Sequence, residues 1–270
     1  MSYEQEFQRP SVAMVSYHNT APFLYGLRKT GIINHIDLHL VKPSDCAAYF
    51  KSGLVDIALV PIGSLYDYSD FEVFSTHCIG AEGSVRTVCI FSQETLDRVD
   101  TVFLDSDSRT SVLLGRMLLE WKFGRKFDFI EGLPHQMDDY PNAAFLLIGD
   151  KVFDAEERFN RRWDLAEAWE EATGLPFVFA VWIRRSGSHT TFPLADFDAA
   201  LAYGVNHIDD MLSESPDLTS FRDYFKENIS YHFDDQKRMA LLKYFVGLQK
   251  LYGWPIPDLE LSKEESYAKN

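Results

Sequence analysis

The sequence predicts an α/β protein of two lobes, with mixed, mostly parallel sheets and a cleft between them. Its 270 residues exceed the usual size of one domain and suit two units of comparable size. Short apolar strands alternate with helical stretches, which is typical of right-handed βαβ units. The alternation begins again near residue 101, so the opening pattern is repeated.

The first lobe is expected to begin with two βα units and a third strand. Each strand is short and apolar, and each helix has start or stop signals such as Pro22 and Gly53. A glycine-bearing loop at residues 79–83 then separates two further strand-like stretches, where we expect a crossover. The predicted strands lie at residues 12–17, 36–41, 55–60, 72–75 and 85–91.

The second lobe repeats the unit and the chain then returns to the first. A long apolar and aromatic strand at residues 176–182 is the expected return. We therefore assign residues 1–88 and 184–270 to the first lobe and residues 89–183 to the second, with crossovers near 85–91 and 177–184. The other predicted strands are 101–104, 127–130 and 143–150, and the predicted helices are 112–123, 165–173, 194–212, 219–231 and 235–252.

Composition excludes several classes of partner. The net charge of −15 repels nucleic acid and anionic membranes, although a small anionic substrate remains compatible because local donors outweigh a distant, screened charge. The chain has no apolar run of about 18 residues, and its first ten residues lack the basic start of an export signal. Three scattered cysteines fit a reducing compartment. We expect a cytoplasmic protein.

Familiar catalytic motifs are absent from the sequence. It has no GxGxxG, GxxxxGK[ST], HExxH or GxSxG. Its eight histidines show no metal-ligand pairing, because the i,i+4 pair His35 and His39 lies where a strand is expected to begin and not on a helix. We therefore expect no metal and no nucleotide cofactor.

The densest polar motif is DSDSRTS at residues 105–111, directly before a predicted helix. Unpaired N–H groups and the positive end of the helix dipole hold anions at such a position, and Ser108, Arg109, Thr110 and Ser111 would add donors. Ordinary helix capping by Ser108 explains the motif equally well. The number of hydroxyls slightly favours a carboxylate-binding turn.

A second candidate site, at residues 16–22, follows the first strand. Ligands bind at the carboxyl ends of strands in open α/β sheets, so Asn19 is placed to bond a substrate hydroxyl. The alternative is an Asx-turn that only starts the helix. His18 is interpreted as a polar neighbour rather than a general base.

Two further positions are weaker candidates. Thr87 enters the crossover strand and can face the cleft, although strand alternation alone also accounts for it. Gly149 and Asp150 end an apolar strand that echoes residues 56–63 of the first half, either as a plain turn or as a cleft rim.

These motifs together resemble the chorismate dehydratase family of the futalosine route to menaquinone. The family pattern matches YHNTAP at residues 17–22, GSVRTV at 83–88, LDSDSRTS at 104–111, IGD at 148–150 and TGLPFVFAVW at 173–182. His18 replaces the usual leucine and Thr87 replaces the usual serine. The five motifs occur in order, which makes the match more specific than any single one.

The resemblance implies a periplasmic-binding-protein-like type II fold with the ligand between the lobes. It also implies a lyase that converts chorismate to 3-[(1-carboxyvinyl)oxy]benzoate and water, without metal or organic cofactor. Asn19 would be catalytic, and the substrate-binding residues would be His18, Thr87, Ser108, Arg109, Thr110, Ser111, Gly149 and Asp150.

Two alternatives stay open at this point. One is the sister enzyme of the same pathway, which forms a dihydroxynaphthoate, although the SRTS turn favours the dehydratase. The other is a binding protein that captures a small carboxylate without turnover. The proton-abstracting base is also open: the substrate's own enolpyruvyl carboxylate is one candidate and His18 is the other.

Overall fold

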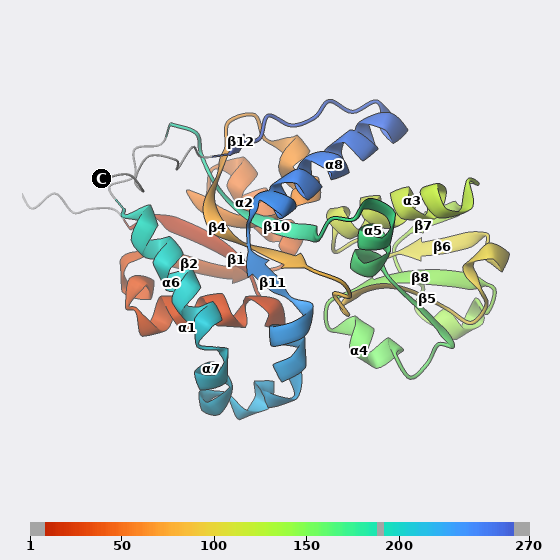
Figure 1. Cartoon of the computed structure of the whole chain (residues 1–270), viewed down its shortest axis with the longest axis horizontal. Helices are drawn as coiled ribbons and strands as arrows, with labels where there is room; N and C mark the ends of the chain where they lie inside the picture. Colours follow the sequence, from red (N-terminus) through yellow and green to blue (C-terminus); the bar gives the residue numbers. More distant parts are fainter. Residues whose placement is uncertain (1–8, 188–191, 262–270) are drawn as a thin grey trace, which may run out of the picture.

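The computed structural model describes residues 9–187 and 192–261, which form two mixed sheets with helices packed against them (Figure 1). We call the larger sheet with its helices the first lobe and the smaller sheet with its helices the second lobe. Within the described residues the sheets have seven and five strands. The predicted α/β fold with two lobes is confirmed.

The sheet of the first lobe has the strand order β11-β4-β10-β3-β1-β2, and β12 also pairs with β4. Strand β1 pairs in parallel with β2 and β3, whereas β10 lies antiparallel between β3 and β4. The return strand β10 therefore completes this sheet. The strands are β1 (Ser11–Val15), β2 (Asp37–Val41), β3 (Ile57–Pro61), β4 (Glu72–Ala81), β10 (Phe177–Arg184), β11 (Ser230–His232) and β12 (Glu260–Leu261).

The sheet of the second lobe has the order β7-β6-β8-β5-β9. It lies between α3 and α5 on one side and α4 on the other (Figure 1). Successive residues of β8 pack on opposite faces of the sheet. Leu146 belongs to the main core, whereas Phe145 packs in a smaller cluster with Val152 of α4. The strands are β5 (Val88–Ser92), β6 (Thr101–Leu104), β7 (Asp128–Glu131), β8 (Ala143–Ile148) and β9 (Arg161–Asp164).

Helices cover both sheets. In the described part of the chain, none is long and apolar enough to cross a membrane. The helix α8 packs against β10 and α3, near the junction of the lobes. The helices are α1 (Ala21–Lys29), α2 (Pro43–Ser52), α3 (Arg109–Phe123), α4 (Lys151–Ala155), α5 (Leu165–Thr173), α6 (Leu194–Asn206), α7 (Ile208–Glu214) and α8 (Asp235–Tyr252).

Most predicted elements are present, and the differences have local causes. Helix α3 begins three residues earlier than predicted because Ser108 caps it. The helix expected at 194–212 is two helices that meet at His207. The helix expected at 219–231 is wrong: a short π-helical turn (Tyr224–Asn228) is followed by β11, because residues 230–232 pair with β4. Strand β9 and helix α4 were not predicted.

A buried carboxylate holds the loop through which the chain enters the second lobe. Asp164 ends β9, is 4% exposed, and caps α5 by accepting from its first N–H groups. It also accepts from the Ser84 hydroxyl at 2.8 Å and from the backbone N–H groups of Val85 and Arg86 at 3.2 and 2.7 Å. Arg86 adopts a φ of 67°, a left-handed conformation that is uncommon in non-glycine residues, and the carboxylate of Asp164 holds its backbone N–H. Thr87 follows directly.

Two glycines allow α1 and α6 to pack backbone to backbone. A Cβ atom added at Gly204 of α6 would lie 1.8 Å from the carbonyl oxygen of Pro22, and one added at Gly26 would lie 1.9 Å from that of Ala200. The close approach anchors α1, whose first turn follows the Asn19 motif. Neither position tolerates a side chain without moving a helix.

Gly204→Ala is therefore expected to lower the free energy of unfolding by about 3 kcal/mol, because the new methyl group meets backbone rather than a flexible side chain. Urea denaturation followed by circular dichroism measures this change. Asp196→Ala, at an exposed position of the same helix, is the control and should change stability by a few tenths of a kcal/mol. Equal effects of the two changes would contradict the packing argument.

Asp164→Ala is expected to lower the free energy of unfolding by about 3–5 kcal/mol, because it leaves several buried donors without an acceptor. The same denaturation measurement applies. Asp138→Ala removes an exposed carboxylate paired with Arg158 and should cost less than about 1 kcal/mol. If the Asp164 variant were as stable as this control, the carboxylate would not be what holds the loop.

Candidate functional site

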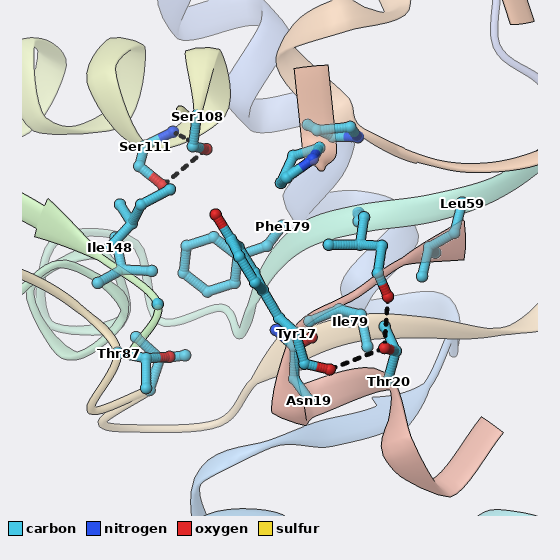
Figure 2. A pocket seen from close by; sticks show the side chains of 17 residues that line it. Tyr17, Asn19, Thr20, Leu59, Ile79, Thr87, Ser108, Ser111, Ile148 and Phe179 are labelled. Atoms are coloured by element: carbon cyan, nitrogen blue, oxygen red, sulfur yellow. Dashed lines mark hydrogen bonds between the residues drawn. The ribbon is translucent and has the colours of Figure 1, made fainter. Parts of the chain in front are cut away.

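A pocket opens between the lobes, where β1, β3 and β8 end and α3 begins (Figure 2). The space between its walls amounts to about 590 Å³, a figure that includes open solvent at its mouth. Apart from its polar side chains, the lining consists of apolar residues and glycine. The polar side chains are those of Tyr17, Asn19, Thr20, Thr87, Ser108 and Ser111.

The turn after β1 leaves the Asn19 side chain available to a ligand. A 3-10 turn (His18–Thr20) connects β1 to α1. Thr20, not Asn19, closes this turn, since its hydroxyl donates to the carbonyl oxygens of Val15 at 2.6 Å and Tyr17 at 2.9 Å. Neither the turn nor α1 has a side-chain cap, and Asn19 Oδ1 is buried without a partner. The Asx-turn alternative is therefore not what the structure shows.

The turn before α3 combines capping and pocket lining. Ser108 Oγ accepts from the Ser111 N–H at 3.2 Å and lies 3.0 Å from Ser111 Oγ. Both serines line the pocket, as the close-up shows (Figure 2). The positive end of the 15-residue helix α3 is thereby directed at the pocket. Helix capping by Ser108 and carboxylate binding by the turn are therefore compatible interpretations of this motif.

Arg109 and Thr110 of the same motif do not line the pocket. Arg109 Nη1 lies 3.0 Å from Asp67 Oδ2, and its guanidinium covers the Trp254 ring at 5.7 Å from the centroid. Thr110 is fully buried at the junction of the lobes, where its Oγ1 accepts from the Gly63 N–H at 2.9 Å. In the part of the chain that the structure describes, no lysine or arginine lines the pocket.

Thr87 lies in the pocket wall just before β5. It is 3% exposed, and its Oγ1 is 3.1 Å from the hydroxyl of Tyr224. Tyr224 comes from the segment where a plain helix was expected, so no sequence signal pointed to it. Nearby, the Tyr231 hydroxyl donates to the Asn19 carbonyl oxygen at 3.0 Å. The C-terminal segment thus contacts both Thr87 and Asn19.

His18 and Asp150 pair with each other across the lobes and do not line the pocket. His18 Nδ1 is 2.7 Å from Asp150 Oδ1, and the imidazole stacks on Phe221 with a centroid distance of 4.4 Å. Gly149 does line the pocket, and its φ of 62° suits glycine. A Cβ atom there would lie 3.4 Å from the Tyr17 ring.

Tyr17 is the pocket residue that sequence reasoning missed. Its ring stands in the middle of the pocket and its hydroxyl points toward Ser108 and Ser111 (Figure 2). Burial raises the pKa of Tyr17, the Asp107 carboxylate raises it further, and Lys151 opposes this. The phenol therefore keeps its proton at neutral pH and acts as a donor. Its place directly after a strand, beside Asn19, was the available signal.

Solved structures with low sequence identity share the fold. A protein of Archaeoglobus fulgidus superposes with a TM-score of 0.70 at 13% identity, covering 90% of this chain and 97% of its own. A Candida albicans gene product described as having the generic periplasmic binding protein fold superposes with a TM-score of 0.65 at 12% identity, covering 92% of both chains. The predicted fold class is confirmed.

Sequence comparisons are more specific. A chorismate dehydratase of Thermus thermophilus is 30% identical over 197 residues, which cover 66% of this chain and 70% of the relative. The profile of a family described as menaquinone biosynthesis matches residues 10–250. That match includes both lobes and every residue of the pocket. The chain therefore belongs to the menaquinone biosynthesis family, as its motifs predicted.

Proposed function

We propose that this protein is a chorismate dehydratase, a lyase that converts chorismate to 3-[(1-carboxyvinyl)oxy]benzoate and water. The observation that carries the proposal is that Asn19, Thr87, Ser108 and Ser111, from three separate motifs, line one pocket between the lobes. The similarity to the Thermus enzyme supports it. The reaction fits a cytoplasmic biosynthetic enzyme with a small anionic substrate.

The chemistry suits a pocket of hydroxyls and amides. Removing the C3 proton of chorismate gives a dienolate conjugated with the ring carboxylate, and loss of the C4 hydroxyl then forms an aromatic ring. Proton and hydroxide together make the water, so no electrons need to be supplied or removed. The protein has to orient the substrate and stabilise developing charge.

The carboxylate clamp is assigned to the start of α3. The hydroxyls of Ser108 and Ser111, at the positive end of the α3 dipole, are donors for a carboxylate. The Tyr17 phenol, directed at the same serines, adds a third hydroxyl. Arg109, which the sequence motif suggested as a further donor, pairs with Asp67 instead and does not line the pocket. Asn19 and Thr87 lie on the opposite part of the lining and would hold the leaving hydroxyl.

The base is assigned to the substrate's enolpyruvyl carboxylate. Among the described residues, those that line the pocket include no aspartate, glutamate, histidine or lysine. His18 is held by Asp150 and Phe221 outside that lining. A carboxylate carried by the substrate itself needs no protein base, provided that the pocket holds the geometry.

Incubation of the purified protein with chorismate is expected to give a product lighter by one water, detected by mass spectrometry and by the absorbance of the aromatic ring. A binding protein would instead be stabilised by chorismate in a thermal shift without any product. Asn19→Ala serves as the control for contaminating activity. No product at micromolar enzyme would refute the proposed activity.

His18→Ala is expected to lower kcat by less than about 10-fold, because we assign the base to the substrate and not to His18. Loss of a general base would lower the rate by about 10²–10⁴-fold. Steady-state kinetics on chorismate provide the measurement, with Asp150→Asn as the matched change to the same pair. A loss of about 10³-fold in kcat, with folding and substrate binding retained, would instead assign the base to His18.

A further inference from the structure

Lys151 joins the two turns of the second lobe that border the pocket. One turn follows β6 and carries Asp105 and Asp107 ahead of the serines of the carboxylate clamp, and the other follows β8 at Gly149. Because β6 and β8 are parallel neighbours, both turns lie at the same edge of the sheet. Lys151 Nζ lies 2.8 Å from Asp105 Oδ2 and 2.6 Å from Asp107 Oδ2. Its ammonium therefore holds both carboxylates of the first turn.

The turn that leads to the clamp carries negative charge, although the proposed ligand is an anion. Asp105 and Asp107 would each repel a carboxylate bound at the start of α3. Arg109, the cation of the same motif, is paired elsewhere and does not line the pocket. In the described part of the chain, the ion pairs of both aspartates are made with Lys151. The charge that offsets this turn thus comes from outside the motif.

The contact between Lys151 and Asp105 is partly buried and has two hydrogen bonds. The Asp105 side chain is 3% exposed and accepts from the ammonium with both oxygens, at 2.9 and 2.8 Å. Its Oδ1 also accepts from the Asp107 backbone N–H at 3.2 Å. Burial lowers the pKa of Lys151, but the hydrogen bonds to the two aspartates outweigh this and raise the pKa above its usual value. The ammonium therefore stays charged at neutral pH and fixes the turn.

We propose that Lys151 is a positioning residue for the carboxylate clamp: its ammonium neutralises the two aspartates and fixes their turn, so that Ser108 and Ser111 can receive an anion. The inference rests on the proposed function and deepens it, because it assigns the positive charge that serves the carboxylate site. Lys151 does not line the pocket and acts through the aspartates. Without its ammonium, the turn would present two uncompensated carboxylates beside the clamp.

Lys151→Met, which removes the charge and keeps most of the side-chain length, tests the proposal. We expect the KM for chorismate to rise about 10-fold while kcat falls less than about 3-fold, because the substrate carries its carboxylate charge in both the ground state and the transition state. Lys151→Arg keeps the positive charge and should leave KM within about 3-fold of the unchanged protein. An unchanged KM in Lys151→Met would overturn the proposal.

The matched control is Lys29→Met, at an ion pair of similar exposure. The Lys29 side chain is 40% exposed, against 45% for Lys151, and its Nζ lies 2.7 Å from Glu214 Oε1. Lys29 ends α1 and does not line the pocket. Its replacement changes the net charge by the same amount and should leave KM unchanged. An equal rise of KM in both variants would overturn the local role of Lys151.

Asp107→Asn tests the sign of the charge. Alone, it should lower KM about 2–3-fold, because it removes a repelling carboxylate and leaves Lys151 paired with Asp105. Added to Lys151→Met, it should recover most of the lost affinity. A purely structural role of Lys151 predicts no recovery, so a double variant as weak as Lys151→Met would overturn the proposal.

Ionic strength gives a second electrostatic measurement. Raising it from about 0.01 M to about 1 M shortens the screening length from about 30 Å to about 3 Å. Since Lys151 and Asp107 are partly exposed, the difference in KM between Lys151→Met and the unchanged protein should shrink at high salt. A difference that does not depend on salt would overturn the electrostatic role.

Urea denaturation tests the same contacts without turnover. Lys151→Met leaves the buried Asp105 carboxylate without its cation, so the urea midpoint should fall, and adding Asp105→Asn should restore part of the loss. Additive losses would overturn the neutralisation of Asp105 by Lys151.

Titration calorimetry with chorismate separates the inference from the proposed activity. If the unchanged protein binds chorismate without converting it, the proposed activity is refuted. Weaker binding by Lys151→Met would then still support the role of Lys151, and equal binding would overturn it. No binding by the unchanged protein would overturn both the clamp and the inference.

Discussion

The backbone contact between Gly63 and Thr110 sets how closely the two lobes approach, and the pocket depends on that distance. The Gly63 N–H donates to Thr110 Oγ1 at 2.9 Å, and a Cβ atom at Gly63 would lie 2.8 Å from the Thr110 nitrogen. Only glycine therefore allows α3 to start so close to the end of β3. Since Thr110 faces this junction, helical geometry fixes where its neighbours on α3 point.

Successive residues on a helix are about 100° apart, so the four residues of the SRTS motif point in different directions. Thr110 points to the junction of the lobes. Ser108 and Ser111, three residues apart, share the side that faces the pocket. Arg109 is turned toward Asp67 and Trp254. The motif as a whole suggested an anion clamp, but only its two serines are placed to act as one.

In the turn between β1 and α1, neighbouring residues also take different roles. Thr20 satisfies the carbonyl oxygens that end β1, and this releases Asn19 from any capping role. The backbone carbonyl of Asn19 is then held by Tyr231 of the C-terminal segment, and Thr87 is held by Tyr224 and by the loop tied to Asp164. Residues from distant parts of the sequence thus supply the rigidity that a positioned amide and hydroxyl require.

The sequence by itself determined the α/β alternation, the two repeated halves and the turns that carry Asn19 and Ser108, because strand and helix periodicity and capping are local properties. It also identified the family through five ordered motifs. Tertiary structure alone decided that Arg109 leaves the pocket, that His18 pairs with Asp150, and that Tyr17 and Tyr224 belong to the site. Those outcomes depend on contacts between residues far apart in the chain, as does the pairing of β11 with β4 that replaced a predicted helix.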